Sequence, residues 1–340
     1  MVRIGIVGLG GMGRGRLSYY ARFADARVEA VADVRARALR GEASLAGAFE
    51  IDPGEVRWFE DYRLLAESGA VDAVDICLPT PMHRDATEVC LGAGLDVLCE
   101  KPMALSLDDC DAMIAASRSA GRVLMIAHCI RFWPEYQFLV DLVRGGSAGR
   151  LLSLRLVRQG PLPGGCGGWM CRRSESGGVL YDLHVHDLDY CQYLLGLPQR
   201  VFAQGGHSSG AHLRYDYVHT DLDYGDGLQV GAFAQWVGAR IPFVARYEAT
   251  LERAFVAFDS SQNPTLRLYR PDVGGPETPT FAPSGAAYAE EIAYFLGCVA
   301  DGRAPNRCPR EESRSTVALA RAASASLERR EVVNAAEWVA

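Results

Sequence analysis

Lysine is almost absent from this 340-residue sequence, because Lys101 is the single lysine among 35 basic residues and the others are arginine. Arginine is effectively always charged, whereas a lysine ammonium group can give up its proton, so a site that must share a proton accepts lysine and excludes arginine. Lys101 follows the apolar segment Leu95–Cys99, which predicts a short buried strand. We therefore expect Lys101 at the carboxyl end of a strand, where open α/β sheets bind their ligands.

Several other absences narrow the classes of function. The net charge of −7 comes without a basic stripe, which argues against nucleic acid as a partner. No apolar stretch reaches the roughly 18 residues of a membrane-spanning helix, so no membrane partner is expected. The first residues, Val2–Val7, enter a strand pattern at once, which predicts no signal peptide and a cytoplasmic protein.

None of the ten cysteines forms a C-x-x-C pair. Several of them lie singly inside apolar runs, which predicts buried, reduced thiols and no metal site. Cys166 and Cys171 are the closest pair, with four residues between them in a glycine-rich segment. A zinc ion there would need two further ligands.

The first third of the sequence alternates strand patterns with stretches of helical spacing. The predicted strands are 2–7, 28–32, 74–78, 95–99 and 123–127. Strands that alternate with helices indicate βαβ units and a doubly wound parallel sheet. We therefore expect an α/β protein whose first domain, residues 1–125, has a Rossmann fold.

After residue 150 the pattern changes to consecutive strands without helices between them. The predicted strands are 151–159, 201–204, 213–223, 228–237, 243–251 and 255–259. The turn Tyr224–Gly227 contains Asp-Gly, a strong hairpin signal. Two helices are expected at 288–299 and 311–329. Residues 126–340 are therefore predicted to form an α+β domain with a large, mainly antiparallel open sheet.

A glycine-rich turn follows the first predicted strand. It is a G-x-G-x-x-G pattern that ends the strand and opens a helix, and its candidate cofactor residues are Gly8, Gly10, Gly11, Met12 and Gly13. Asp33 lies 20 residues past Gly13, where a carboxylate could accept hydrogen bonds from ribose hydroxyls. Its negative charge would repel a 2′-phosphate, so NAD is favoured, while Arg35 leaves NADP possible.

A second loop is expected at the same edge of the sheet. Pro79, Thr80 and His83 follow the predicted strand 74–78. The prolines would stiffen the backbone beneath a bound cofactor. The alternative is an ordinary strand-to-helix loop with His83 near the start of the helix.

The densest group of titratable residues lies between Gly177 and Asp189. If a helix starts near Asp182, then Asp182, His186 and Asp189 share one face, and Asp182 could orient His186 as a general base. Read as a strand instead, Asp182, His184 and His186 could hold a divalent metal ion. The apolar stretch from Leu188 to Leu195 favours the helix.

These residues together resemble the glucose–fructose oxidoreductase and inositol dehydrogenase family (Gfo/Idh/MocA). The resemblance covers nearly the whole sequence and is carried by the glycine turn, by Glu100-Lys101-Pro102, and by Gly177-Gly178 followed by Asp182-x-x-x-His186. It implies a cofactor between Pro79-Thr80 and Glu100-Lys101, and an open sheet that often forms the interface of a homo-oligomer, here a dimer or tetramer.

The resemblance also assigns roles to individual residues. Lys101, Asp182 and His186 match the catalytic lysine, aspartate and histidine of the family. Ile130 and Arg131 match a segment that borders the substrate, and His184 replaces a glycine found in many members. Trp169 lies in a loop, residues 161–176, that fits no known substrate pattern, and its Arg172 and Arg173 either bind an acidic substrate or face solvent.

The resemblance implies an NAD-dependent oxidoreductase that interconverts a secondary alcohol and a ketone on a sugar, cyclitol or related polyol. Two other functions remain open on the same residues. One is an NAD-dependent glycosidase that oxidises, eliminates and reduces in turn. The other is a non-catalytic NAD-binding sugar sensor, which would have no need of the lysine, aspartate and histidine.

Overall fold

The computed structural model describes the chain except for residues 41–53, 164–167, 208–214, 282–285 and 340. It contains two sheets, and each lies within its own compact unit. The first unit comprises residues 1–129 and 285–314, and the second comprises residues 130–284 and 315–340.

The first unit contains a six-stranded parallel sheet in the order β3-β2-β1-β4-β5-β6. Its strands are β1 (Val2–Val7), β2 (Ala26–Ala32), β3 (Arg57–Phe59), β4 (Ala73–Ile76), β5 (Asp96–Glu100) and β6 (Leu124–Ala127). This order is that of a Rossmann fold, in which ligands bind where the strand order reverses, between β1 and β4. The predicted fold class of the first unit is confirmed.

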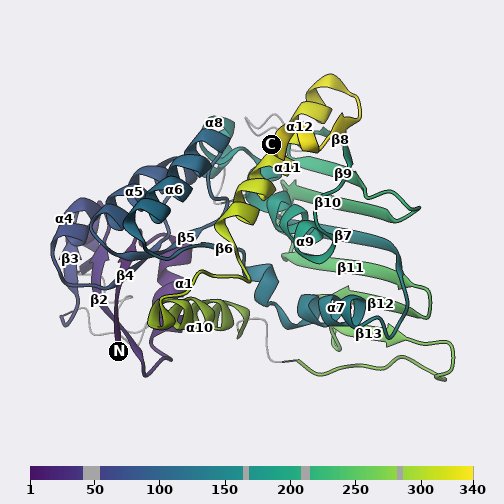
Figure 1. Cartoon of the computed structure of the whole chain (residues 1–340), viewed down its shortest axis with the longest axis horizontal. Coiled ribbons are helices and arrows are strands. Elements are labelled where there is room, and N and C mark those ends of the chain that lie inside the picture. Colours follow the sequence, from purple (N-terminus) through teal and green to yellow (C-terminus); the bar gives the residue numbers. More distant parts are fainter. Residues whose placement is uncertain (41–53, 164–167, 208–214, 282–285, 340) are drawn as a thin grey trace. The chain divides into compact units, whose positions relative to one another are not determined.

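Helices cover both faces of this sheet. They are α1 (Gly11–Tyr20), α2 (Ala36–Arg40), α4 (Tyr62–Glu67), α5 (His83–Gly92), α6 (Leu107–Ala120) and α10 (Ala286–Asp301), with a short 3-10 turn η1 (Thr80–Met82) before α5. Figure 1 shows α5 and α6 on one side of the sheet and α10 on the other. Ser106 caps α6 by accepting a hydrogen bond from the Asp109 amide, and Gly121 ends the helix in the left-handed conformation.

The second unit is built on an eight-stranded sheet in the order β13-β12-β11-β7-β10-β9-β8-β14. Its strands are β7 (Leu151–Pro161), β8 (Arg200–Gly206), β9 (Tyr217–Asp223), β10 (Gln229–Val237), β11 (Val244–Leu251), β12 (Ala254–Asp259), β13 (Leu266–Tyr269) and β14 (Val333–Asn334). All neighbouring strands are antiparallel except β7 and β10. The predicted mainly antiparallel sheet is confirmed, and β9 and β10 form the hairpin predicted from Asp-Gly.

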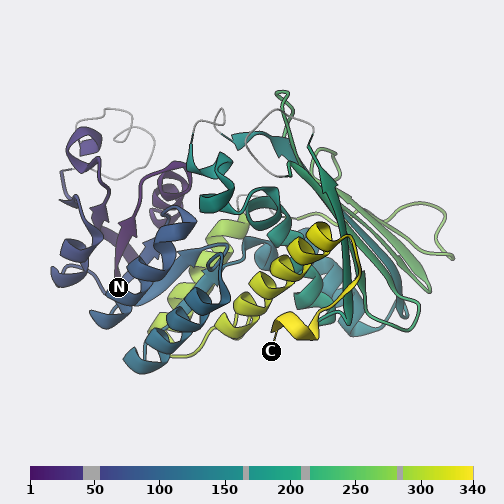
Figure 2. The same cartoon turned by 90° about the horizontal axis from the view of Figure 1, so that it is seen from above.

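The helices of the second unit lie on one face of its sheet. They include α7 (Pro134–Gly145), α9 (Val185–Leu195), most of α11 (Arg310–Arg329) and α12 (Ala336–Val339). Figure 2 shows helices along one side of the large sheet, and no described element covers its other side. Burial alternates along β10, which is typical of a sheet with one face in the core.

The division of the chain differs in one respect from the predicted domains 1–125 and 126–340. Residues 285–314 return to the first unit because α10 packs against α1 there. Tyr288 of α10 stacks on Tyr19 of α1, with ring centroids 5.5 Å apart, and Ile292 and Phe295 are fully buried. Sequence order alone assigned this helix to the second domain.

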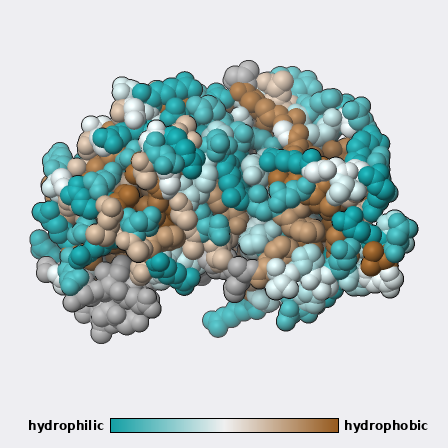
Figure 3. Space-filling view, turned by 60° about the horizontal axis from the view of Figure 1, so that its bottom comes forward, coloured by the Kyte–Doolittle hydropathy of each residue, from teal (hydrophilic) through white to brown (hydrophobic). Residues whose placement is uncertain are grey.

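Hydrophobic and hydrophilic side chains both occur on the surface. On the face shown in Figure 3, hydrophobic and hydrophilic residues are interspersed. No helix among the described residues is long and apolar enough to cross a membrane.

Candidate active site

The glycine turn after β1 is shaped for close approach by a ligand. Gly8 has a φ of +92°, which favours glycine, and a Cβ on Gly13 would lie 1.9 Å from the carbonyl oxygen of Gly8. Above Gly10 and Gly11, no described atom lies within 4 Å of where a Cβ would stand. The backbone between β1 and α1 is therefore open on the side where a pyrophosphate would meet the helix N-terminus.

We predict that Gly13→Ala disrupts this turn. The added methyl group cannot share the space of the Gly8 carbonyl oxygen, so the start of α1 must shift away from β1. The dissociation constant for NAD, measured by calorimetry, should rise by about tenfold or more, since each 1.4 kcal/mol of lost binding energy is a factor of ten. Gly15→Ala on the same helix, where a Cβ meets no described atom within 4 Å, is the matched control and should bind normally.

Asp33 stands at the end of β2 and is already engaged. One carboxylate oxygen accepts hydrogen bonds from the Leu9 amide at 2.8 Å and from Arg35 Nη2 at 3.2 Å, and the other accepts from the Arg35 amide at 2.8 Å. Burial opposes its ionisation, but the hydrogen bonds from Arg35 and Leu9 outweigh burial and lower the Asp33 pKa. Asp33 is therefore a held anion beside the glycine turn, and its contact with ribose stays a prediction.

The loops after β4 and β5 are joined through His83. Its Nδ1 lies 2.9 Å from the Pro102 carbonyl oxygen and its Nε2 lies 2.9 Å from the Leu78 carbonyl oxygen. Burial lowers the His83 pKa, against the hydrogen bonds of these carbonyls, so the ring is neutral near pH 7. His83 ties the two loops together, with Thr80 also buried. Its predicted contact with cofactor stays a prediction.

Lys101 directly follows β5, at the edge of the sheet where it was expected. It is half-buried, and its backbone amide lies 3.3 Å from Glu100 Oε2. Glu100 Oε1 in turn accepts a hydrogen bond from the buried Arg16 at 2.7 Å. The position of the lysine backbone is thus tied to a buried ion pair.

The segment that precedes α9 is a π-helical turn, Leu180–His184, and the regular helix starts only at Val185. The predicted helix is present, but its first turn is a π turn, which adds a residue to the helical repeat between Asp182 and His186. Asp182 and His186 are both half-buried. Their contact with a substrate stays a prediction.

His184 has a different environment from the one expected. Its side chain is fully buried and its Nε2 lies 2.9 Å from the Thr220 hydroxyl of β9. Burial, with further positive charge from His219 and Arg158, lowers the His184 pKa to about 3. The imidazole is therefore a neutral part of the interior beneath the large sheet, and its predicted contact with a substrate stays a prediction.

Two carboxylates of the cluster are bound by arginines that the sequence analysis did not connect with them. Arg158 of β7 holds Asp187 through two hydrogen bonds of 3.0 and 2.7 Å, and Arg131 holds Asp189 through two of 2.9 and 2.8 Å. Asp189 also accepts a hydrogen bond from the Thr316 hydroxyl at 2.9 Å. Arg131 and Ile130 are buried, and their predicted place beside the substrate stays a prediction.

The loop after β7 gives its arginines structural partners. Trp169 is half-buried in a 3-10 turn, η4 (Trp169–Cys171). Arg172 and Arg173 are exposed and pair with Glu175 and Glu328, at 2.6 and 3.0 Å, which supports the interpretation that they face solvent. The role of Trp169 toward a substrate stays a prediction.

Cysteine usage differs from the expectation at one position. Eight of the ten cysteines are free thiols, whereas Cys171 is disulfide-bonded. Cys166, the remaining cysteine, lies outside the described residues. No group of three or more His, Cys, Asp or Glu side chains suited to a metal ion occurs in the described part of the chain.

Comparison with known proteins places this geometry in a family. Residues 2–128 match the family described as "Oxidoreductase family, NAD-binding Rossmann fold", and residues 136–251 match the "GFO/IDH/MocA C-terminal domain". The chain belongs to the Gfo/Idh/MocA family. The first unit of this family member is accordingly an NAD-binding Rossmann fold, and the open turn at Gly8–Gly13 fits that cofactor.

Two curated relatives of this chain have names that denote different activities. The chain is 31% identical to myo-inositol 2-dehydrogenase of Thermotoga maritima over 60% of this chain and 58% of that protein. It is 32% identical to 2,7-anhydro-N-acetylneuraminate hydratase of Escherichia coli over 51% of this chain and 49% of that protein. The first curated relatives are thus matched over only 50–58% of their own length.

A solved structure agrees over the whole Gfo/Idh/MocA chain. A probable dehydrogenase from Thermotoga maritima has a TM-score of 0.82 at 26% sequence identity and covers 99% of this chain and 100% of its own. The fold of each unit is therefore shared with that solved structure.

Proposed function

We propose that the protein is an NAD-dependent dehydrogenase that interconverts a secondary alcohol and a ketone on a sugar, cyclitol or related polyol. One observation carries the proposal. The single lysine of the sequence directly follows β5 of an NAD-binding Rossmann unit, and its place in Glu100-Lys101-Pro102 supports its assignment as the catalytic lysine. Asp182 and His186 occupy the other two catalytic positions of the family.

Each of the three side chains has a distinct task in this proposal. His186 takes the proton of the substrate hydroxyl, and Asp182 fixes the orientation and tautomer of the imidazole. The Lys101 ammonium group donates a hydrogen bond to the oxygen as negative charge develops on it. When bound at the glycine turn, NAD would supply the hydride acceptor for oxidation.

A substrate panel tests this function directly. The purified enzyme is incubated with NAD and a set of inositols, aldoses, anhydro sugars and sugar acids, and formation of NADH is followed by absorbance. We expect a rate with at least one polyol, and loss of that rate in Asp182→Asn. Failure of every polyol to reduce NAD, together with normal binding of NAD, would contradict the proposal and favour a sensor.

A second candidate function is a redox-neutral reaction of an anhydro sugar. The likeness to a 2,7-anhydro-N-acetylneuraminate hydratase favours it. Transient oxidation would make a neighbouring C–H acidic, elimination would follow, and re-reduction would restore NAD. Product formation from an anhydro sugar by chromatography, without net NADH, would distinguish this function from the first.

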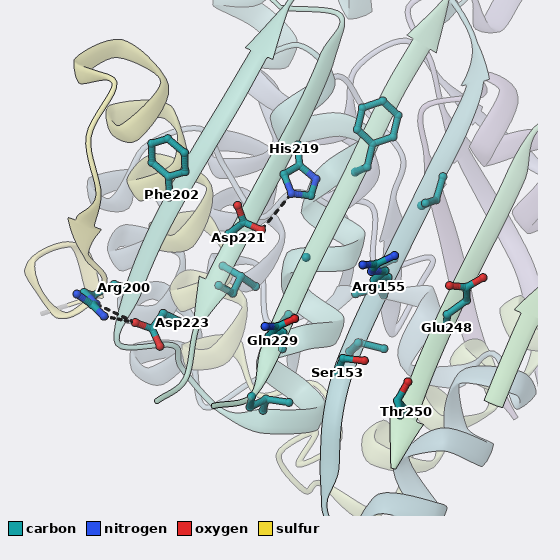
Figure 4. A pocket seen from close by; sticks show the side chains of 18 of the residues that line it. Ser153, Arg155, Arg200, Phe202, His219, Asp221, Asp223, Gln229, Glu248 and Thr250 are labelled. Carbon is teal, nitrogen blue, oxygen red and sulfur yellow. Dashed lines mark hydrogen bonds and ion pairs between the residues drawn. The ribbon is translucent and has the colours of Figure 1, made fainter. Parts of the chain in front are cut away.

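We further propose that the open face of the large sheet joins copies of this chain. Figure 4 shows a concave part of that face, of about 850 Å³, with Arg155 and Glu248 on neighbouring strands and Phe202 farther across the sheet, on β8. Opposite charges and aromatic side chains on one open face suit a self-complementary two-fold interface. Light scattering should give the mass of a dimer or tetramer, and a mass of one chain at micromolar concentration would contradict this.

The protein is also proposed to work in the cytoplasm. Eight free cysteines support a reducing compartment, whereas the disulfide at Cys171 argues the other way. Fractionation of the source cells, with blotting for the protein, tests this location. We expect the protein in the cytoplasmic fraction, and its recovery outside the cytoplasm would refute the proposal.

A further inference from the structure

A fully buried arginine beneath the glycine turn faces three carboxyl groups. Arg16, on α1, places Nη2 2.7 Å from Glu100 Oε1, Nη1 2.8 Å from Glu291 Oε2, and Nε 3.5 Å from Asp75 Oδ2. The side chains of Arg16, Asp75 and Glu291 are entirely inaccessible to solvent. Four elements therefore meet at one guanidinium: α1, β4, β5 and α10.

The charges of this cluster do not balance if every group is ionised. One guanidinium would then face three carboxylates, which leaves two uncompensated negative charges in the interior. Burying unpaired charge is costly, so carboxyl groups bind protons instead. Burial, together with the neighbouring carboxylates Glu100 and Asp75, raises the Glu291 pKa to about 8 against the attraction of Arg16. Burial also raises the Asp75 pKa.

Glu100 connects this cluster to the proposed catalytic lysine. Its Oε1 accepts from Arg16, and its Oε2 lies 3.3 Å from the backbone amide of Lys101. Arg16 belongs to the helix that begins at the glycine turn. Arg16 donates a hydrogen bond to Glu100 and forms an ion pair with Glu291, so a change in its attraction to Glu291 would act one residue from the lysine.

The other titratable groups around the cluster keep their protons in the neutral range. The Tyr20 hydroxyl lies 3.2 Å from Asp75, the Cys77 thiol lies 3.4 Å from Asp75, and the Tyr288 ring lies under the Arg16 guanidinium at 5.6 Å. Burial raises the pKa of Tyr20 and of Cys77, while a nearby Cys129 and burial raise that of Tyr288. Among these described groups, Glu291 is the one whose pKa of about 8 lies close to neutral pH.

We propose that Glu291 is a positioning residue for Lys101: as a neutral acid it leaves Arg16 to hold Glu100, and once ionised it competes for Arg16 and loosens the Glu100–Lys101 turn. This inference rests on the proposed function of Lys101. It assigns a role in catalysis to a helix that sequence order places in the other half of the chain. Its consequence is a fall in turnover on the alkaline side that originates outside the reacting groups.

The activity test compares three forms of the whole enzyme. They are the wild type, Glu291→Gln, which keeps the shape and stays neutral, and Glu290→Gln, an identical change at an exposed site on the same helix. We measure kcat and KM against pH with the best polyol. In wild type and Glu290→Gln, kcat should fall about tenfold per pH unit above pH 8, as expected for loss of one proton. In Glu291→Gln that limb should disappear or move upward by about one unit or more.

Two outcomes of this test separate the inference from the function on which it rests. An unchanged alkaline limb in Glu291→Gln, with normal activity at pH 7, overturns the inference and leaves the dehydrogenase proposal standing. Absence of activity with every polyol in the wild type refutes the dehydrogenase proposal instead. A positioning role also predicts that Glu291→Gln changes kcat more than KM. A purely structural role would not favour a change in kcat over a change in KM.

A readout without turnover tests the proton itself. A carboxyl with a raised pKa in the folded state holds a proton that the unfolded chain has lost, so it stabilises the fold at low pH and this contribution fades as pH rises from about 4.5 to about 8. The unfolding midpoint of wild type relative to Glu291→Gln should therefore fall across this window. If the variant does not fold, the infrared carbonyl band of a buried neutral carboxyl in the wild type, lost between pH 7 and 9, serves instead. A band or midpoint that stays constant overturns the inference.

Discussion

Lys101→Arg is expected to lose most of its turnover while NAD still binds. Arginine keeps the positive charge but holds its proton permanently and is larger and planar, so it cannot stand in for an ammonium group that donates to a developing alkoxide at a set position. Loss of a positioned acid–base or charge-stabilising group lowers rates by about 10²–10⁴-fold. The measurement is kcat with the best polyol, alongside calorimetric binding of NAD.

The reverse exchange provides the control for this variant. Arg118→Lys alters an exposed arginine of the same Rossmann unit that pairs with Glu311 at 3.0 Å. It should leave kcat unchanged, because neither residue approaches the sheet edge at Lys101. Turnover of Lys101→Arg within a few-fold of wild type would remove the main support for the proposed function.

Asp187→Ala is expected to destabilise the second unit more than any surface change. Arg158 and Asp187 are almost fully buried, with exposed side-chain fractions of 2% and 0%. Removing the carboxylate takes away both of its hydrogen bonds with Arg158 and leaves the positive charge of Arg158 in the interior without the carboxylate that balances it. Breaking one partner of such a pair costs about 3–5 kcal/mol. The denaturant midpoint followed by circular dichroism measures the loss.

Two further variants distinguish an unpaired buried charge from lost packing. Glu328→Ala breaks an exposed pair with Arg173 and should cost only about 0–1 kcal/mol. The double replacement of Arg158 by Met and Asp187 by Leu removes both charges and should recover most of the stability. If the denaturant midpoint shifts no more for Asp187→Ala than for Glu328→Ala, then losing the carboxylate beside Arg158 has little effect on the free energy of unfolding, and the prediction is wrong.

The strands of both sheets were predictable because their signals are local. Val2–Val7 was predicted with the bounds that the structure has, and β4 to β6 and β7 to β12 differ by a few residues at their ends. Apolar runs between turn residues mark buried strands without any knowledge of their neighbours. The short strands β3, β13 and β14 were missed, since short segments carry too few residues for a pattern to emerge.

The pairing of buried charges was not predictable in the same way. Asp187 and Asp189 lie in the titratable cluster that the sequence revealed. Their arginine partners are 29 and 58 residues away in the sequence, which no local pattern indicates. His186 and Asp189 lie three residues apart in the regular helix α9, but Asp189 is bound by Arg131, a partner 58 residues away that helical spacing alone could not indicate. One signal was available and unused: Glu291 falls on the same helical face as Tyr288 and Phe295, which indicated a buried acid.

The return of α10 to the first sheet has a consequence for biosynthesis. The Rossmann unit is assembled from two separate stretches, so the ribosome must deliver residue 314 before the last of its parts can dock. Until then the nascent N-terminal portion carries Arg16 without Glu291 and Tyr19 without its stacking partner. The Rossmann unit therefore cannot finish folding when synthesis has reached only residue 129. A fragment that ends at residue 129 would need residues 285–314, supplied as a separate peptide, to complete this unit.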